Sequence, residues 1–206
     1  GMLVLLSKFP LKFHYFMADI MAWLMRKVVR YRYSTVMINL SRSFPDRKYK
    51  EIEKIAKDFY THLGEIFAEA IWFGGSSYKR LYDSGMVTVT NPEELNELYL
   101  STPSMTVLST HCGNWELLGG IFAYLDAGNA KYPFEQENMK VVYKKLSSPV
   151  WDEVFKRNRI SPLDKKKEEC VIESSNILRY AISHKKEKKI YVYPADQAPY
   201  KGTGRH

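Results

Sequence analysis

The chain has 206 residues, of which 45% are hydrophobic and 26% are charged, a composition typical of one globular domain and not of a disordered segment. Its formal charge of +8 favours an anionic partner, such as a phospholipid, a phosphorylated glycolipid, an acidic carrier protein or a nucleic acid. The two cysteines, Cys112 and Cys170, lack CxxC spacing and signal neither a disulfide framework nor a zinc site, so a reducing compartment fits best.

The first predicted element is a largely apolar helix that begins near Pro10 and ends near Tyr33. It lacks the roughly 18 uninterrupted apolar residues that a membrane-spanning helix requires. Basic residues gather at its end: Arg26, Lys27, Arg30 and Arg32. Two interpretations stay open. The helix can lie in a bilayer interface with its cations toward lipid phosphates, or it can be a buried core helix with a solvated polar edge.

A second helix follows, because apolar residues recur at helical spacing from Ile52 to Ala70 and stop at Gly74-Gly75. Residues 10–75 are therefore predicted to be helical. The period changes at residue 86, where Met86 to Thr90 alternate as in a strand.

The rest of the chain alternates between predicted strands and helices. Strands are expected at 105–108, 141–143 and 190–193, and helices at 114–124, 149–158 and 173–184. Asn91-Pro92 can cap a further short helix. This order predicts an α/β fold, in which a helical amino-terminal region precedes a mixed sheet flanked by helices at 86–206. We expect residues 1–206 to form one domain whose carboxy-terminal part continues beyond residue 206.

The motif with the clearest chemistry is Ser109-Thr-His-Cys-Gly-Asn-Trp-Glu116, between a predicted strand and a predicted helix. Ligands of open α/β sheets gather at the carboxyl ends of strands, where this motif lies. On a straight helix His111 and Glu116 would point about 140° apart, so they meet only if the chain turns. Gly113 permits that turn, and Asn114 can cap the helix that carries Glu116.

A carboxylate bonded to one imidazole nitrogen leaves the other nitrogen as a general base near neutral pH. The sequence contains no GxSxG nucleophile elbow, so direct attack by an activated acceptor hydroxyl is the simpler hypothesis. A purely structural interpretation, in which Glu116 only stabilises a helix start, stays open beside it. No second histidine lies near His111, so we predict no metal site and no cofactor.

The run His111-Cys-Gly-Asn-Trp-Glu116 resembles the HxxxxD/E block of the lysophospholipid acyltransferase superfamily, in its bacterial lipid A biosynthesis branch. Residues 22–32 and 39–46 are similar to that family's amino-terminal membrane-proximal helix and linker. Tyr143 to Asp152 resembles its block YRPxxNPxxD, with Lys144 in place of arginine, and Arg159 follows at the expected distance. Tyr193-Pro-Ala-Asp-Gln197 resembles its final Asp-Gln block.

The resemblance implies an acyltransferase in which His111 activates an acceptor hydroxyl that attacks an acyl thioester, while Glu116 orients and charges His111. It implies Arg159 and Asp196 as further catalytic residues. Oxyanion stabilisation is expected from backbone N–H groups near Gly113 and Asn114, or from Arg159. The expected substrate-binding residues are Gly113, Asn114, Trp115, Tyr143, Lys144 and Gln197.

The expected partners are acyl carrier protein or acyl-CoA as donor, an anionic glycolipid or lysolipid as acceptor, and a membrane surface. The expected location is the cytoplasmic face of the bacterial inner membrane, peripheral or anchored by the amino-terminal helix. The alternative is a non-catalytic, basic domain that binds membrane surfaces. Nucleic acid is not an expected partner, because the aromatic residues fall at core positions and are not interleaved with a basic stripe.

Overall fold

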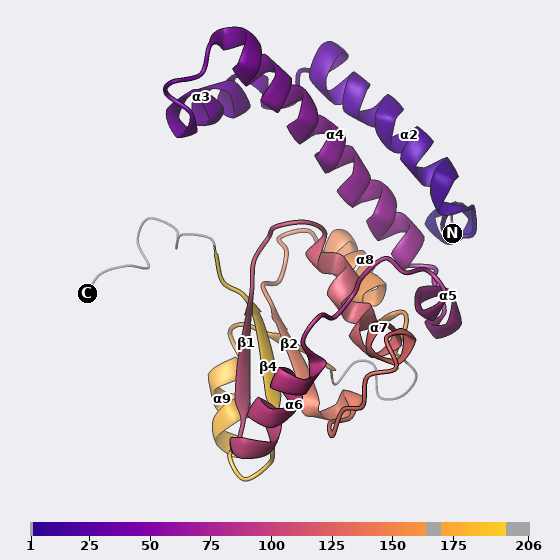
Figure 1. Ribbon diagram of the computed structural model, residues 1–206, viewed down its shortest axis with the longest axis vertical. Helices are drawn as coiled ribbons and strands as arrows, with labels where there is room; N and C mark the ends of the chain where they lie inside the picture. Colours follow the sequence, from indigo (N-terminus) through magenta and orange to yellow (C-terminus); the bar gives the residue numbers. More distant parts are fainter. Residues whose placement is uncertain (1, 164–169, 197–206) are drawn as a thin grey trace. The chain divides into compact units, whose positions relative to one another are not determined.

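The computed structural model describes residues 2–163 and 170–196 (Figure 1). The chain divides after Gly75 into two compact units, which we call the amino-terminal unit (1–75) and the carboxy-terminal unit (76–206). The division follows Gly74-Gly75, where the sequence predicts the helical region to stop. That the two units form one domain stays a prediction.

The amino-terminal unit consists of helices. They are α1 (Met2–Ser7), α2 (Leu11–Trp23), the π-helical η1 (Leu24–Val28), α3 (Tyr33–Ser43) and α4 (Tyr49–Phe73). The single helix predicted from Pro10 to Tyr33 is therefore wrong beyond Val28. Arg30 and Arg32 adopt φ values of 51° and 50°, and this left-handed conformation cannot continue a right-handed helix.

Helix α2 packs against α4 through small residues and leaves its large ones exposed. Ala18 and Ala22 are buried on α2, and Gly64 lies opposite them on α4. The exposed apolar side chains of α2 and η1 are Phe16, Met17, Ile20, Trp23, Leu24 and Val28. This distribution does not match a helix that is buried in a core. Within the described residues, no helix is both sufficiently long and sufficiently apolar to cross a bilayer.

The close approach of α2 and α4 gives a stability prediction for Gly64. A Cβ atom at this position would lie 2.7 Å from the carbonyl oxygen of Ala18, which belongs to a helix backbone and cannot rotate away. We expect Gly64→Ala to lower the free energy of unfolding by about 1–3 kcal/mol, measured by chemical denaturation followed by circular dichroism. Gly128→Ala is the control, because a Cβ there makes ordinary contacts of 3.5 Å or more. Equal stability of the two variants would contradict the prediction.

In its described residues, the carboxy-terminal unit combines helices with four strands. Its first elements are α5 (Tyr78–Tyr82), α6 (Pro92–Ser101), β1 (Met105–Ser109), the 3₁₀ helix η2 (Trp115–Gly120) and α7 (Ile121–Ala127). A second 3₁₀ turn, η3 (Gln136–Asn138), leads into β2 (Met139–Tyr143) and α8 (Pro149–Ile160). The last described elements are β3 (Val171–Glu173), α9 (Ile177–Ser183) and β4 (Ile190–Pro194).

The four strands form one sheet in the order β1-β4-β2-β3, and every described pair is parallel. The α/β prediction is confirmed, but the predicted mixed sheet is wrong. Each strand returns through a helical crossover on the way to the next, which aligns all four in one direction. The predicted strand at 86–90 is also wrong: Val89 packs on the core cluster without entering the sheet. The predicted helix at 173–184 begins only at Ile177, because β3 precedes it.

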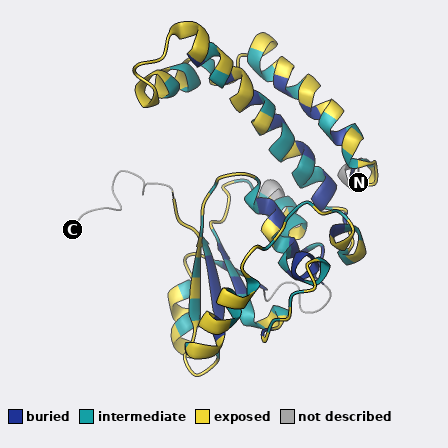
Figure 2. Ribbon diagram, in the orientation of Figure 1, coloured by how far each residue is buried: buried dark blue, intermediate teal, exposed yellow. Residues whose placement is uncertain are grey.

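Alternation along the strands assigns the two faces of the sheet. Val107, Val141 and Val192 belong to one face, where they meet aromatic and aliphatic residues of α6, α7 and the loop after α7. The buried members of this core are Tyr99, Phe122, Leu125, Phe134, Ile190 and Val192. Many of the buried residues of the unit accordingly lie on β2, β4 and α7 (Figure 2). Lys140 lies on the opposite face, with its ammonium group 5.9 Å from the ring centroid of Tyr180 on α9.

Candidate active site

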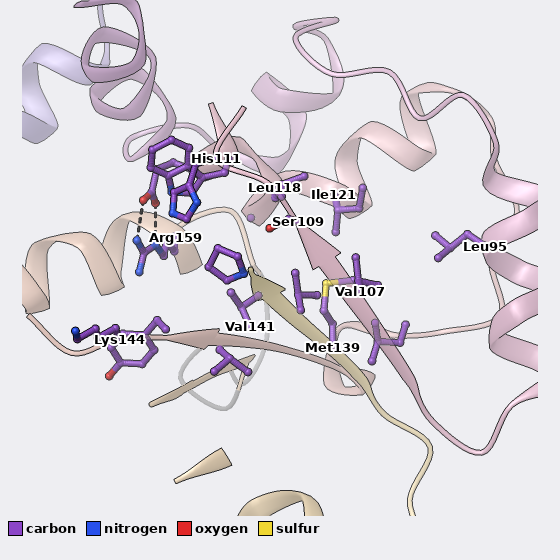
Figure 3. Close-up of a pocket in the computed structure, with 18 of the residues that line it drawn as sticks. Leu95, Val107, Ser109, His111, Leu118, Ile121, Met139, Val141, Lys144 and Arg159 are labelled. Atoms are coloured by element: carbon purple, nitrogen blue, oxygen red, sulfur yellow. Dashed lines mark hydrogen bonds and ion pairs between the residues drawn. The ribbon is translucent and has the colours of Figure 1, made fainter. Parts of the chain in front are cut away.

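A cavity of about 320 Å³ lies against the valine face of the sheet (Figure 3). This volume is within the range of small-molecule sites. Most of its lining is aliphatic or aromatic: Leu95, Val107, Leu118, Ile121, Phe134, Met139, Val141, Val142, Ile190 and Val192. Strands β1 and β4 contribute alternate residues to this lining, as the period of two in a strand predicts, and β2 adds Val142 to its alternate residues.

Polar side chains are concentrated at one end of this cavity. His111, Arg159 and Lys144 lie near one another there, whereas Leu95 and Met139 lie toward the other end (Figure 3). His111 follows the carboxyl end of β1 and Lys144 follows the carboxyl end of β2. The polar end therefore has the position at which open parallel sheets bind ligands.

The imidazole of His111 is held by Asp196, which follows β4. Nδ1 of His111 contacts Oδ1 of Asp196, and the backbone N–H of His111 donates to Oδ2 over 2.7 Å. A carboxylate can only accept, so Nδ1 carries the proton and Nε2 keeps a lone pair in the neutral ring. The hydrogen bond from the His111 side chain, followed by that from its backbone N–H, lowers the pKa of the Asp196 carboxyl.

Glu116 and Arg159 form a second, separate pair. Nε of Arg159 donates to Oε2 of Glu116 over 2.8 Å, and Nη2 donates to Oε1 over 2.7 Å. The Glu116 side chain is only 6% exposed, and this bidentate pair satisfies both of its oxygens. The pair fixes the guanidinium group of Arg159, on α8, at the polar end of the cavity.

Glu116 and His111 therefore do not form the contact that the sequence predicts, because each side chain has another partner. The turn at Gly113 occurs as predicted, with a φ of 66°, and the side chain of Asn114 accepts the backbone N–H of Glu116 over 3.2 Å. Glu116 then lies in the first turn of the 3₁₀ helix η2 and pairs with Arg159 of α8 instead of the imidazole. Only the sheet reveals the carboxylate that meets His111, because that residue is 85 positions away.

A comparison with known protein families identifies the family of this chain. The family model of the bacterial lipid A biosynthesis acyltransferases matches residues 1–203. The chain belongs to this family. No curated protein matches the sequence.

As a lipid A biosynthesis acyltransferase, the chain uses an acyl donor and a lipid acceptor, and the cavity can be compared with that chemistry. An acyl chain needs a long apolar recess, and the transfer needs polar groups at its mouth. The cavity of this acyltransferase has a mostly apolar lining and polar side chains at one end. Among the described residues, no group of three or more His, Cys, Asp or Glu side chains is arranged to hold a metal ion.

Three of the six residues predicted for substrate binding in this acyltransferase line the cavity: Trp115, Tyr143 and Lys144. The ring of Trp115 meets that of His111 edge-on at 4.6 Å. Gly113 and Asn114 form the turn before Glu116 and do not belong to the cavity lining. Burial, followed by the charge of Asp152, raises the pKa of the Tyr143 hydroxyl, which is therefore a donor at neutral pH. Gln197 lies outside the described residues.

Sequence reasoning missed the apolar wall of the acyltransferase cavity. The sequence predicts a strand that contains Val107 but gives this residue no role in the site. The available signal was the alternation of apolar residues on 105–109, 139–143 and 190–194. This alternation predicts a buried face, but it does not distinguish a filled core from a cavity.

Proposed function

We propose that this chain transfers a fatty acyl group from an acyl thioester, carried by acyl carrier protein or coenzyme A, to a hydroxyl of a lipid A precursor or related glycolipid. The observation that supports this proposal is the apolar cavity with His111 at its polar end. An acyl chain in the cavity would place its thioester carbonyl beside the imidazole, so binding and chemistry share one recess.

The proposed reaction uses His111 as the general base. Its Nε2 atom takes the proton of the acceptor hydroxyl while the hydroxyl oxygen attacks the thioester carbonyl carbon. The tetrahedral intermediate then collapses, the carbon–sulfur bond breaks, and the imidazolium returns its proton to the departing thiolate. The products are an ester and a free thiol, and no other reactant is required.

The positive charge at the polar end supports the steps in which negative charge develops. Arg159 is fixed by Glu116 in the same part of the cavity as His111, where it can stabilise the oxyanion of the tetrahedral intermediate. Glu116 thus contributes to the reaction by holding Arg159. Lys144, which also lines the cavity, suits an anionic acceptor or the phosphate of the donor.

The test of this function is direct acyl transfer in detergent. Labelled acyl carrier protein and labelled acyl-CoA are offered separately with a lipid A precursor and with a lysophospholipid, and mass spectrometry identifies the product. We expect an acylated glycolipid with at least one donor. A protein that is inert with every pair but still binds anionic vesicles would favour the non-catalytic, membrane-binding alternative.

We also propose that α2 and η1 attach the protein peripherally to the cytoplasmic face of the bacterial inner membrane. Phe16 and Trp23 lie seven residues apart on α2 with 62% and 55% of their surface exposed. This spacing puts both on one helix face. Basic residues of η1, Arg26 and Lys27, follow at the end of the helix and suit lipid phosphates.

This attachment predicts a loss of vesicle binding when the exposed aromatic residues become polar. Each of Phe16 and Trp23 contributes at least about 1.5 kcal/mol if it enters the bilayer. We therefore expect Phe16→Ser with Trp23→Ser to weaken co-sedimentation with anionic vesicles by roughly 100-fold. Phe67→Ser, at an exposed position on α4, is the control. Unchanged binding of the double variant would contradict the proposal.

We expect the residues at the far end of the cavity to set the preferred length of the acyl chain. Leu95, on α6, lies remote from His111, so a larger side chain there shortens the recess without reaching the polar end (Figure 3). We expect Leu95→Trp to favour donors that are shorter by two or more carbons, at about 0.8 kcal/mol per methylene, in a competition assay. Leu98→Trp, on the same helix and exposed, is the control. Identical chain-length profiles would show that Leu95 does not limit the acyl chain.

A further inference from the structure

The position of Asp196 beside His111 follows from the register of the sheet. Strands β1 and β4 pair in parallel from Met105 with Ile190 to Ser109 with Pro194. The backbone N–H of Ala195 donates to the carbonyl of Ser109 over 3.0 Å, which continues the pairing beyond the strands. His111 and Asp196 have the same separation of 85 residues as the paired strand positions. They lie two positions beyond the last strand pair, Ser109 with Pro194, in the same register.

Asp196 holds His111 at two points. One carboxylate oxygen meets Nδ1 of the ring and the other accepts the backbone N–H of the same residue. Two contacts to one residue restrict both the rotation of the side chain and the position of the loop. The contact at Nδ1 also determines which ring nitrogen is protonated.

Glu116 binds Arg159 and not His111. Both of its oxygens accept N–H groups of Arg159, and its side chain is 6% exposed. A move of Glu116 to the imidazole would separate a largely buried bidentate pair, which is costly. The two carboxylates therefore have different partners: Asp196 pairs with the base and Glu116 with the arginine.

We infer that Asp196 is the positioning residue of His111: it holds the Nδ1-protonated tautomer, so that Nε2 faces the substrate as the base, and it stabilises the imidazolium formed during acyl transfer. This inference rests on the proposed function and assigns the role that the HxxxxE spacing had suggested for Glu116. Asp196 itself neither contacts the substrate nor gives up a proton.

The experiment reads the tautomer of His111 directly. In protein with ¹⁵N-labelled histidine, ring nitrogen shifts report which nitrogen carries the proton, and His111→Ala assigns the signal among the five histidines. We expect protonated Nδ1 in the parent. In Asp196→Asn the amide can donate to Nδ1, so the tautomer should change to protonated Nε2.

Activity is measured on the same variants. We expect Asp196→Asn to lower kcat by roughly 10²- to 10⁴-fold through the wrong tautomer, with KM for the acyl donor changed little. Glu116→Gln should keep the His111 tautomer. Asp83→Asn, at an exposed carboxylate paired with Lys79, controls for the loss of a charge. Thermal unfolding checks that each variant is folded.

The outcomes separate this inference from the proposed function. An unchanged tautomer in Asp196→Asn, or an inverted tautomer in Glu116→Gln, would overturn the role of Asp196. If the tautomer responds to Asp196→Asn while the parent transfers no acyl group, the positioning role stands and the proposed function fails.

Discussion

His111→Ala should lower the rate of acyl transfer by about 10²- to 10⁴-fold, because it removes the only group proposed to accept the proton of the acceptor hydroxyl. The apolar wall of the cavity is unchanged by this substitution, so the donor should still bind. The loss should therefore appear in kcat and not in KM for the donor. Initial rates with a labelled acyl thioester at saturating acceptor measure both constants.

A matched histidine substitution separates this effect from general damage. His62 lies on α4 with more than half of its side chain exposed and pairs with Glu65 over 3.6 Å. We expect His62→Ala to transfer at the parent rate. If His111→Ala also transferred at that rate, the general-base mechanism would be wrong.

The second large effect is expected at the pair of Glu116 and Arg159. Glu116→Ala leaves a partly buried guanidinium group without its bidentate partner, and this should reduce the free energy of unfolding by about 3–5 kcal/mol. Arg159→Met should also be destabilising, whereas the double variant should lose less than the sum of the two. We expect a coupling energy of about 1–3 kcal/mol in a double-mutant cycle, measured by chemical denaturation.

Helix α8 supplies its own control for that cycle. Arg157 and Glu153 pair on its surface, with 77% and 51% of their side chains exposed. Exposed pairs at this spacing contribute about 0.3–0.5 kcal/mol, so Arg157→Met with Glu153→Gln should show little coupling. A coupling energy for Glu116 and Arg159 no larger than this control value would refute the role of the pair. Transfer assays on the single variants then report the contribution of Arg159 to catalysis.

Local signals in the sequence predicted much of the fold. Gly74-Gly75 and Asn91-Pro92 mark element ends by backbone chemistry that acts within a few residues. The apolar runs at 105–108 and 190–193 predicted two strands correctly. The strand predicted at 86–90 failed because alternation reports burial of one side, which packing without strand pairing also satisfies.

In the site, too, the sequence predicts contacts between neighbours in the chain but not contacts between distant residues. The turn at Gly113 and the cap at Asn114 were predictable, because both depend on neighbours in the chain. The partners of His111 and Glu116 were not, since they lie 85 and 43 residues away and depend on register and helix packing. Spacing within one motif shows which residues can meet, but the sheet decides which of them do.

The position of β4 also affects how the enzyme folds. This strand is the last described in the chain, yet it occupies an interior place in the sheet between β1 and β2. Neither earlier strand can complete its backbone hydrogen bonding on that side until β4 inserts, and such long-range pairing is slow. Asp196 follows the same strand, so a chain emerging from the ribosome acquires the last residue of the His111 pair only when the sheet closes. The order of synthesis thus delays the pairing of His111 with Asp196 until β4 has joined the sheet.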